Sequence, residues 1–513
     1  MLNRRTTLRL GAGAAVGAIS GGMIAGSATA VTSRIASRGK TGPDWFRLGT
    51  HLSGDLVLPT DAAYDQARRL AIGQFDVIRP QAVAYCATER DVRTTLAFAQ
   101  DNALRLVPRS GGHSFAGYST TTGVVLDVSR LNSVRLSKNT VVMGPGVQQV
   151  DALAKLAPRG VSLASGLCPG VCPGGFVQGG GMGWQTRKFG MASDRLISAR
   201  VVLADGRAVT ASATEHRDLF WALRGGGGGN FGVVTRFELR PTHVPTFVNF
   251  NLTWPWEAAH RVIAAWQRWV IAGPREIGTG LGVQWLDAGT GRPDLLVYGG
   301  WLGTPGRFTP VLDALVAEVG SAPATRGVAE QTFEKAMMSY YRCAELTPDQ
   351  CHTVGYSPEA KLPRANYAID RSRLFSAAIP DTGVEKALQA FTANPRAGQF
   401  RFLSFFALGG AAKEPGRRDT AFVHRDSEFN LGYSLGLHDP KYTPEDEQAG
   451  QAWADNGFRA IDPYSNGESY QNFIDPSLAD WQSAYYGENY AKLRAVKQKY
   501  DRHRLFSFAQ GIA

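Results

Sequence analysis

Two glycines stand directly before a histidine in the stretch RSGGHSFAGYS, which runs from Arg109 to Ser119. Glycine lets a backbone come close to a ligand, and an imidazole can bind or become attached to that ligand. A histidine in an ordinary surface turn would have the same neighbours. Taken alone, the stretch predicts either a ligand-contacting side chain at His113 or a simple turn.

A second stretch, ASGLCPGVCPGGFVQGGGMGW, places Cys168 and Cys172 among glycines and prolines. So much Gly and Pro is incompatible with a helix or a regular strand, so both thiols are expected on loops. A local disulfide or a pair of buried small side chains are the alternatives to a chemical role. Five cysteines are too few for a disulfide scaffold, but Cys343 and Cys351 could pair within one loop of an exported protein.

The glycine run in LRGGGGGNFGVV contains G-x-G-x-x-G from Gly227 to Gly232. A dinucleotide fingerprint of this kind requires a strand before it and a helix after it. Here the helical pattern RDLFWALR precedes the run and the strand pattern VVTRFELR follows it. The run therefore predicts close backbone approach to a flat or phosphorylated ligand rather than a Rossmann fold.

The sequence GYSLG, from Gly432 to Gly436, matches the G-x-S-x-G elbow of serine hydrolases, and His503 could complete a triad around Ser434. An elbow needs a strand, a sharp turn and a helix, whereas FNLGYSLGLHDP has the pattern of one strand. A serine hydrolase stays a distant alternative. The nine histidines show no H-E-x-x-H or C-x-x-C pairing, so no metal site is expected.

The elements that must position these stretches fall into two regions. Residues 76–240 alternate short apolar runs, helical segments and glycines, as in RDVRTTLAFAQDNAL followed by RLVPRS. Residues 241–453 contain less glycine and alternate strands such as FRFLSFFALGG with helices such as WEAAHRVIAAWQRWVI. We expect an α+β protein whose second domain is built on an antiparallel sheet.

Composition and charge narrow the class of protein. A chain of 513 residues with 44% hydrophobic and 19% charged residues is long enough for two or three folded domains. The net charge is +11, but the Lys and Arg residues are scattered, which argues against a nucleic-acid surface.

The N-terminal stretch MLNRRTTLRLGAGAAVGAISGGMIAGSATA carries a twin arginine, a weakly apolar segment and a small-residue cleavage signal. This pattern predicts a twin-arginine signal peptide over residues 1–30 and a secreted protein. A transmembrane anchor is the alternative, although so many glycines make a poor spanning helix.

With RSGGHSFAGYS, GLCPGVCPGG and GGGGGNFGVV in this order, then SYQNF and YYGENYAKL, the chain resembles the berberine bridge enzyme-like FAD-linked oxidases of the vanillyl alcohol oxidase superfamily. The resemblance covers nearly everything after residue 70. It implies the two-domain vanillyl alcohol oxidase-type fold, in which residues 45–240 and the returning residues 456–513 bind FAD. Residues 241–455 then form the substrate domain, a large antiparallel sheet backed by helices.

The resemblance implies an FAD attached twice, through the histidine His113 and through the cysteine Cys168. Cys172 is the alternative anchor, but it falls where the family usually has glycine. Val171 occupies the position that governs oxygen access in the family. The remaining residues expected around the cofactor are Arg109, Ser110, Gly111, Gly112, Ser114, Gly174, Gly175, Gly180, Gly181, Gly232 and Asn472.

Oxidation of an alcohol also needs a base for the hydroxyl proton. By resemblance this base is Tyr470 in SYQNF, with Tyr433 in LGYSLG as a candidate partner and Glu468 as another possible base. A phenol with a pKa near 10 needs such a neighbour to favour its phenolate or to relay the proton.

The implied function is hydride transfer from an alcohol carbon of a sugar or glycosylated natural product to FAD, with O₂ giving H₂O₂. Exported bacterial oxidases that tailor antibiotics and sugars are of this type. An oligosaccharide oxidase of primary metabolism, an oxidative cyclase and a flavin carrier with little turnover are the alternatives. The expected partners are the small-molecule substrate and O₂, with no nucleic acid, no membrane after signal removal, and a monomer or weak dimer.

Overall fold

The computed structural model describes residues 42–244 and 246–513, so the expected signal peptide lies outside the described residues. Residues Trp45–Ala513 form one compact unit. The predicted domain boundaries at 240 and 455 therefore stay predictions, and helix α12 (Pro444–Ile461) runs across the second of them. None of the helices in the described part of the chain is long and apolar enough to cross a membrane.

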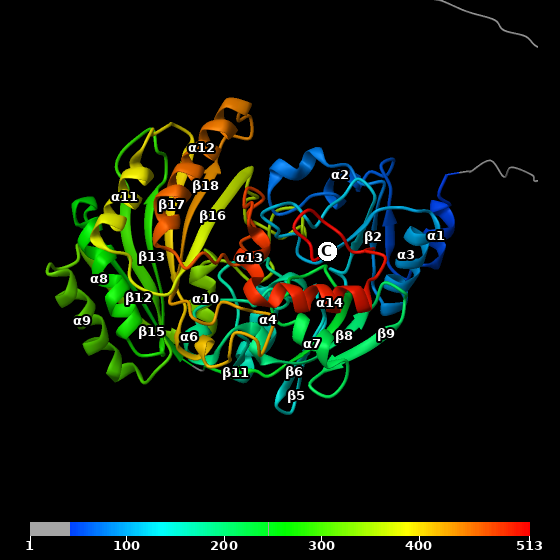
Figure 1. Cartoon of the computed structure of the whole chain (residues 1–513), viewed down its shortest axis with the longest axis horizontal. Coiled ribbons are helices and arrows are strands. Elements are labelled where there is room, and N and C mark those ends of the chain that lie inside the picture. The colour runs from blue at the N-terminus through cyan, green and yellow to red at the C-terminus, as the bar shows by residue number, and fades with distance from the viewer. Residues whose placement is uncertain (1–41, 245) are drawn as a thin grey trace, which may run out of the picture. The chain divides into compact units, whose positions relative to one another are not determined.

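Two small sheets are built from the first half of the chain (Figure 1). One has the order β1-β2-β4-β3, with β2, β4 and β3 parallel to one another. Its strands are β1 (Asp55–Val57), β2 (Ala82–Tyr85), β3 (Leu106–Arg109) and β4 (Val124–Asp127). The other is antiparallel, in the order β5-β6-β10-β8-β9. Its strands are β5 (Val134–Ser137), β6 (Thr140–Met143), β8 (Leu196–Val202), β9 (Ala208–Ser212) and β10 (Val233–Leu239).

Helices and a short strand pair surround these sheets. Helix α3 (Glu89–Asp101) begins at a capping box in which Thr88 and Asp91 satisfy each other's backbone N–H groups. The other helices of this region are α1 (Trp45–His51), α2 (Tyr64–Ala67), α4 (Gln149–Leu156), α5 (Pro173–Phe176), α6 (Thr186–Phe189) and α7 (Arg217–Ala222). The strand pair joins β7 (Val161–Ser162) to β11 (Thr242–His243).

The expected large antiparallel sheet is confirmed. It has seven strands in the order β15-β12-β14-β13-β17-β18-β16. They are β12 (Thr246–Trp254), β13 (Ile277–Trp285), β14 (Asp294–Trp301), β15 (Thr325–Thr332), β16 (Tyr367–Phe375), β17 (Gln399–Ala407) and β18 (Phe429–Leu437). Alternate side chains along the strands, such as Leu403 and Phe405 of β17, are fully buried. This period of two directs one face of the sheet toward the helices.

That face is covered by α8 (Ala259–Ala272), α9 (Phe308–Val319), α11 (Asp381–Thr392) and α12 (Figure 1). The remaining helices are α10 (Phe333–Tyr340), α13 (Trp481–Tyr486) and α14 (Tyr490–Tyr500). Helix α14 packs on the first region, where Lys499 pairs with Asp218 of α7 at 2.6 Å. The end of the chain therefore returns to the part of the molecule in which it began.

The serine-hydrolase alternative is wrong. Residues Gly432–Gly436 lie in the middle of β18, which is paired with β16 on one side and β17 on the other. The hydroxyl of Ser434 donates a hydrogen bond to the carboxyl group of Asp370 on β16. Because no turn or helix follows the serine, it is not an exposed nucleophile of the elbow type.

Cys343 and Cys351 form a disulfide and are both completely buried. The disulfide closes the loop after α10. His352, the residue after Cys351, contacts Gln148 at 2.8 Å and Asp151 at 3.2 Å. The loop is thereby held against the start of α4.

Replacing both disulfide cysteines by alanine is expected to lower the free energy of unfolding by about 2.5 kcal/mol, because the unfolded chain regains the entropy of an open loop. Chemical denaturation measures the difference. Wild-type protein in a thiol reductant serves as the control and should show a similar loss. Unchanged denaturation midpoints in the variant and in reduced wild type would contradict a stabilising role for this bond.

Candidate active site

A cavity of about 320 Å³ is lined by the glycine-rich stretches of the first region, by residues 470–474 of the returning chain and by Phe406 of β17. It brings together most of the residues predicted from the sequence. Those that line it are Arg109, Ser110, Gly111, Gly112, His113, Ser114, Cys168, Val171, Cys172, Gly174, Gly175, Gly232, Tyr470 and Asn472.

Arg109 fixes the turn that carries the histidine. It ends strand β3, where its guanidinium pairs with Asp127 at 2.5 Å and donates to the carbonyl of Ala67 at 2.7 Å. Gly112 follows with φ +64°, a left-handed conformation that favours glycine. The turn therefore bends sharply at this point and presents His113 to the cavity.

His113 is half-buried, and its ring lies edge-on to Phe115 with 6.3 Å between the ring centroids. Burial lowers the pKa of this imidazole below its ordinary value. The neutral form is favoured, which leaves a nitrogen lone pair free to bond to carbon or to a metal.

The two candidate cysteines differ in exposure. Cys168 is exposed, whereas Cys172 is buried with its sulfur 3.5 Å from the carbonyl oxygen of Gly146. Cys172 also packs beneath Gly111, where a Cβ atom would approach its sulfur to 2.9 Å. Burial raises the pKa of the Cys172 thiol, which disfavours its reactive thiolate form. These contacts favour Cys168 as the thiol that a ligand can reach.

Tyr470 is buried, and its phenolic oxygen accepts two hydrogen bonds of 2.8 Å, from the backbone N–H of Gly181 and from Nδ2 of Asn472. The same Nδ2 donates to the carbonyl of Phe176 at 3.0 Å, which fixes the orientation of the amide. Burial raises the pKa of Tyr470, and the donors from Gly181 and Asn472 oppose that rise. The tyrosine therefore faces groups that stabilise its phenolate.

Gly180 and Gly181 are corrections to the predicted cofactor shell, because neither lines the cavity. A Cβ atom at Gly180 would lie within 3 Å of Phe422, and Gly181 supplies the N–H group that holds Tyr470. Gly181 therefore supports the tyrosine, and Gly180 packs against Phe422.

Tyr433 is also a correction. Its hydroxyl donates to the carbonyl of Ala387 at 2.7 Å, and its ring packs against Trp453 on the helix-covered face of the sheet. It points away from the cavity and cannot relay a proton to Tyr470. The groups that contact the phenolic oxygen of Tyr470 are Gly181 and Asn472 instead of Tyr433.

Glu468 is unavailable as a base. Its carboxylate contacts His424 at 2.8 Å and Arg417 at 2.6 Å. Burial acts to raise the pKa of Glu468, but the hydrogen bonds from His424 and Arg417 outweigh it and lower that pKa. Both carboxylate oxygens thus already have a hydrogen-bond partner, one in His424 and the other in Arg417.

Several residues that line the cavity were missed by the sequence analysis. They include Phe176, Gln471, Phe473 and Phe508. Gln471 and Phe473 adjoin the predicted tyrosine, so the motif SYQNF was the available signal for them. Phe508 lies near the end of the chain and no pattern marks it.

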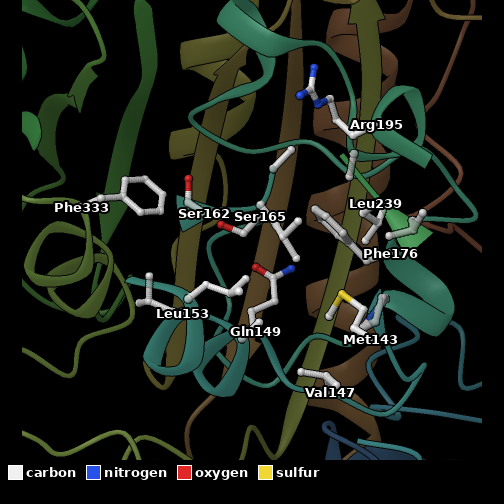
Figure 2. Close-up of a pocket in the computed structure, with 17 residues that line it drawn as sticks. Met143, Val147, Gln149, Leu153, Ser162, Ser165, Phe176, Arg195, Leu239 and Phe333 are labelled. Carbon is white, nitrogen blue, oxygen red and sulfur yellow. The ribbon is translucent and has the colours of Figure 1, made fainter. Parts of the chain in front are cut away.

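A second cavity of about 50 Å³ is shown in Figure 2, and Phe176 is among the residues that line both cavities. Its walls are mostly apolar, with Met143, Leu153 and Leu239 among them. The side-chain oxygen Oε1 of Gln149 is buried without a hydrogen-bond partner. It lacks the combination of histidine, thiol and tyrosine found in the larger cavity.

Across the described residues, no group of three or more His, Cys, Asp or Glu side chains is arranged to hold a metal ion. The larger cavity instead fits a flat dinucleotide. Its glycine-rich walls at Gly174, Gly175 and Gly227–Gly229 leave backbone exposed, and backbone N–H groups of this kind bind phosphates. The donor set and the size of the cavity suit FAD.

Comparison with known proteins agrees with this fit. Residues 80–212 match the FAD binding domain model, and residues 469–513 match the berberine and berberine-like model. The chain is 29% identical to an FAD-linked oxidoreductase of Bacillus subtilis, over 90% of this chain and 98% of the relative. It is also 29% identical to the xylooligosaccharide oxidase of Thermothelomyces thermophilus, over 84% of this chain and 87% of that protein.

Solved structures extend the comparison. The BBE-like 1 protein of Physcomitrella patens superimposes with a TM-score of 0.81 at 24% identity, covering 91% of this chain and 99% of that one. The glucooligosaccharide oxidase of Acremonium strictum, described with a 6-S-cysteinyl, 8α-N1-histidyl FAD, gives a TM-score of 0.79 at 25% identity and covers 90% and 97%. The chain therefore carries an FAD binding domain and a berberine-like segment, its relatives are FAD-linked oxidoreductases, and it is an FAD-dependent oxidoreductase.

Proposed function

We propose that this enzyme is a secreted oxidase that converts an alcohol carbon of a sugar or glycosylated natural product to a carbonyl, with FAD attached through both His113 and Cys168. The observation that carries the proposal is the single cavity that gathers His113, the exposed Cys168 and the hydrogen-bonded Tyr470. The relatives named for oxidation of oligosaccharides support a carbohydrate substrate.

The chemistry that FAD supplies when bound is acceptance of a hydride from the carbinol carbon and delivery of the two electrons to O₂ as H₂O₂. The chain must bind the cofactor, exclude water and take the hydroxyl proton. The neutral imidazole of His113 and the thiol of Cys168 are the proposed attachment points. Ser110, Ser114 and the glycines of the wall hold the phosphates, and Val171 borders the path of O₂.

Tyr470 is the proposed base. Loss of the hydroxyl proton to its phenolic oxygen lets the C–O bond gain double-bond character as hydride leaves carbon. Because Gly181 and Asn472 already donate to that oxygen, proton transfer requires no rearrangement of the tyrosine. Asn472 is thus proposed to act on the base rather than on the cofactor alone.

Secretion is supported by the twin-arginine stretch before residue 30 and by the buried disulfide between Cys343 and Cys351. Disulfides persist mainly in oxidising compartments.

Tyr470→Phe is expected to slow flavin reduction by about 10²- to 10⁴-fold, because the base is lost while the ring stays in place. Anaerobic mixing with xylo-, cello- and chito-oligosaccharides and with glycosylated natural products, followed by flavin absorbance, measures the rate. The matched control is Tyr433→Phe. It removes a hydrogen bond to Ala387, costs about 1 kcal/mol of stability and leaves the rate unchanged.

If no compound of this panel bleaches the wild-type flavin, the enzyme is not an oxidase of sugars or their glycosides. If Tyr433→Phe slows reduction as much as Tyr470→Phe does, the assignment of the base is wrong.

The acid side of the pH profile tests the same base. Burial raises the pKa of Tyr470 above its ordinary value, so the phenolate fraction is small at neutral pH and grows as pH rises. The rate of flavin reduction is therefore expected to rise from acid to neutral pH in wild type and to be flat over that range in Tyr470→Phe. A wild-type rate that falls as pH rises from acid to neutral would contradict proton transfer to this tyrosine.

A further inference from the structure

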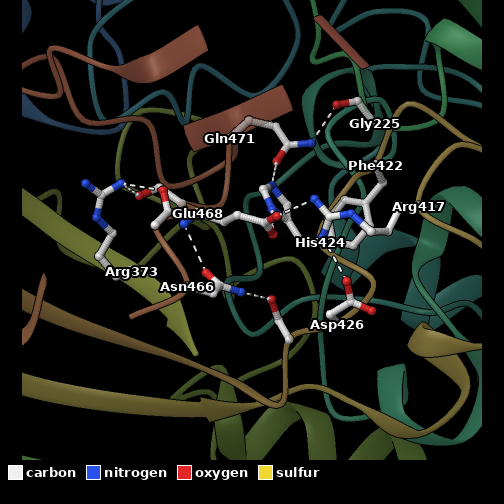
Figure 3. Close-up of polar contacts among 12 residues, drawn as sticks. Gly225, Arg373, Arg417, Phe422, His424, Asp426, Asn466, Glu468 and Gln471 are labelled. Atoms are coloured by element: carbon white, nitrogen blue, oxygen red, sulfur yellow. Dashed lines mark hydrogen bonds and ion pairs between the residues drawn. The ribbon is translucent and has the colours of Figure 1, made fainter. Parts of the chain in front are cut away.

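A buried histidine lies beside the catalytic segment without a role in the chemistry described above. His424 is on the loop between residues 413 and 429, and its ring is almost completely buried (Figure 3). Its Nδ1 lies 2.8 Å from Oε2 of Glu468, and its Nε2 lies 3.0 Å from Oε1 of Gln471. The two partners flank Tyr470 on the same strip of chain.

The orientation of the Gln471 amide is fixed by a third group. Its Nε2 donates to the carbonyl oxygen of Gly225 at 2.5 Å (Figure 3). A flipped amide would place two oxygens against each other, so Oε1 must face the ring. An amide oxygen only accepts hydrogen bonds, and the contact therefore requires a proton on Nε2 of His424.

The other ring nitrogen also faces an acceptor. The second carboxylate oxygen of Glu468 accepts from Arg417 at 2.6 Å, and an arginine in a protein is always charged, so the carboxyl group is paired with a permanent cation and is ionised. An ionised carboxylate has no proton to donate. The contact with Nδ1 therefore requires a proton on that nitrogen as well.

We propose that His424 is held as a buried imidazolium and that it is a positioning residue for the Tyr470–Asn472 segment. The effect of His424 on the reaction rests on the proposed oxidase function, whereas the charge state of its ring does not. The two positive charges of His424 and Arg417 are matched by Glu468, which contacts both, and by Glu488, which pairs with Arg417. Breaking one partner of such a buried pair leaves the other charge uncompensated, which ties the segment to this protonation state.

Two series of contacts connect the imidazole ring of His424 to the larger cavity, one through Gln471 and one through Phe422. Gln471 lines the cavity and bonds to Gly225, the first residue of the glycine run whose Gly227–Gly229 line it too. The ring of Phe422 lies edge-on to His424 at 5.0 Å and to Tyr470 at 6.2 Å. Loss of one imidazolium proton would set a lone pair against the oxygen of Gln471 or Glu468 and loosen both paths.

The charged groups around His424 come from three parts of the chain. From its own loop they are Arg417, Arg425 and Asp426, from the returning segment Glu468, and from the stretch before α14 Glu488, which pairs with Arg417 at 2.9 Å. Arg425 is neutralised by Asp194 at 2.7 Å. Hence Glu468 is the carboxylate that contacts the ring directly.

The first test reads the charge state in the holoenzyme without any substrate. In protein labelled with ¹⁵N-histidine, the two ring nitrogens of His424 are expected to give the matching shifts of an imidazolium at neutral pH, with His424→Gln used to assign the signals. One protonated and one bare nitrogen would overturn the proposal.

The second test reads the consequence on anaerobic flavin reduction by an oligosaccharide that bleaches the wild type. The flavin-reduction rate of wild type is expected to fall at alkaline pH, over the range in which the ¹⁵N signals of His424 convert to those of the neutral ring. This fall is opposite in direction to the rise from acid to neutral pH that is expected from Tyr470. His424→Gln, which offers only a neutral donor toward Gln471, is expected to be about tenfold slower and to lack the alkaline fall.

The control is His260→Asn on α8, where the imidazole bonds at the surface to the carbonyl of Asp381. It should keep the wild-type profile. A His424→Gln enzyme with the wild-type alkaline fall would overturn the positioning role. If no sugar reduces the flavin, the proposed function fails while the ¹⁵N signals still decide the charge state. If His424→Gln does not fold, the ¹⁵N signals and the alkaline fall of wild type decide.

Discussion

One hydrogen bond closes the site, and the rest of the structure depends on it. The N–H of Gly181 donates to the phenolic oxygen of Tyr470 across 289 residues of sequence. Gly181 has φ +81°, and a Cβ atom there would come within 2.7 Å of Ala192 and Phe176. Only glycine satisfies both conditions, so the backbone at this point is fixed by the need to reach the tyrosine. The base is consequently oriented by main chain rather than by a mobile side chain.

Tyr470, the acceptor of that hydrogen bond, belongs to the C-terminal segment that returns to the first region. The buried ammonium of Lys497 on α14 uses its three protons on Asn230, Asp501 and Phe506, at 2.6, 2.7 and 2.5 Å. Burial lowers the pKa of Lys497 and the charge of Asp501 opposes that shift. Asn230 ends the glycine run that lines the cavity, so the same cation joins the returning helix to the cofactor wall. The hydrogen bonds of Lys497 thus both stabilise the fold and position the wall of the cavity.

Much of this arrangement could be predicted from sequence, because glycine-rich loops and the helix and strand periods are local signals. The large antiparallel sheet is of this kind, whereas the attachment roles of His113 and Cys168 follow only from the resemblance to the family. Tyr433 was misplaced because the face on which a strand residue lies depends on register. In β18 the alternation sends Leu431, Tyr433 and Leu435 toward the helices. His424 was missed because its partners are 44 and 47 residues away and no spacing marks them.

The central claim is that one flavin is held between His113 and Cys168 while Tyr470 faces the same cavity. Trypsin cleavage after Arg109, Arg130, Arg159 and Arg187 places the two anchors in separate peptides, 110–130 and 160–187. The most direct measurement is the mass of the flavin-bearing material after denaturation and digestion, with fragmentation to locate the bonds. The account predicts one species in which both peptides are joined to a single flavin, at His113 and at Cys168. Flavin released by denaturation, or attached at Cys172, would contradict it.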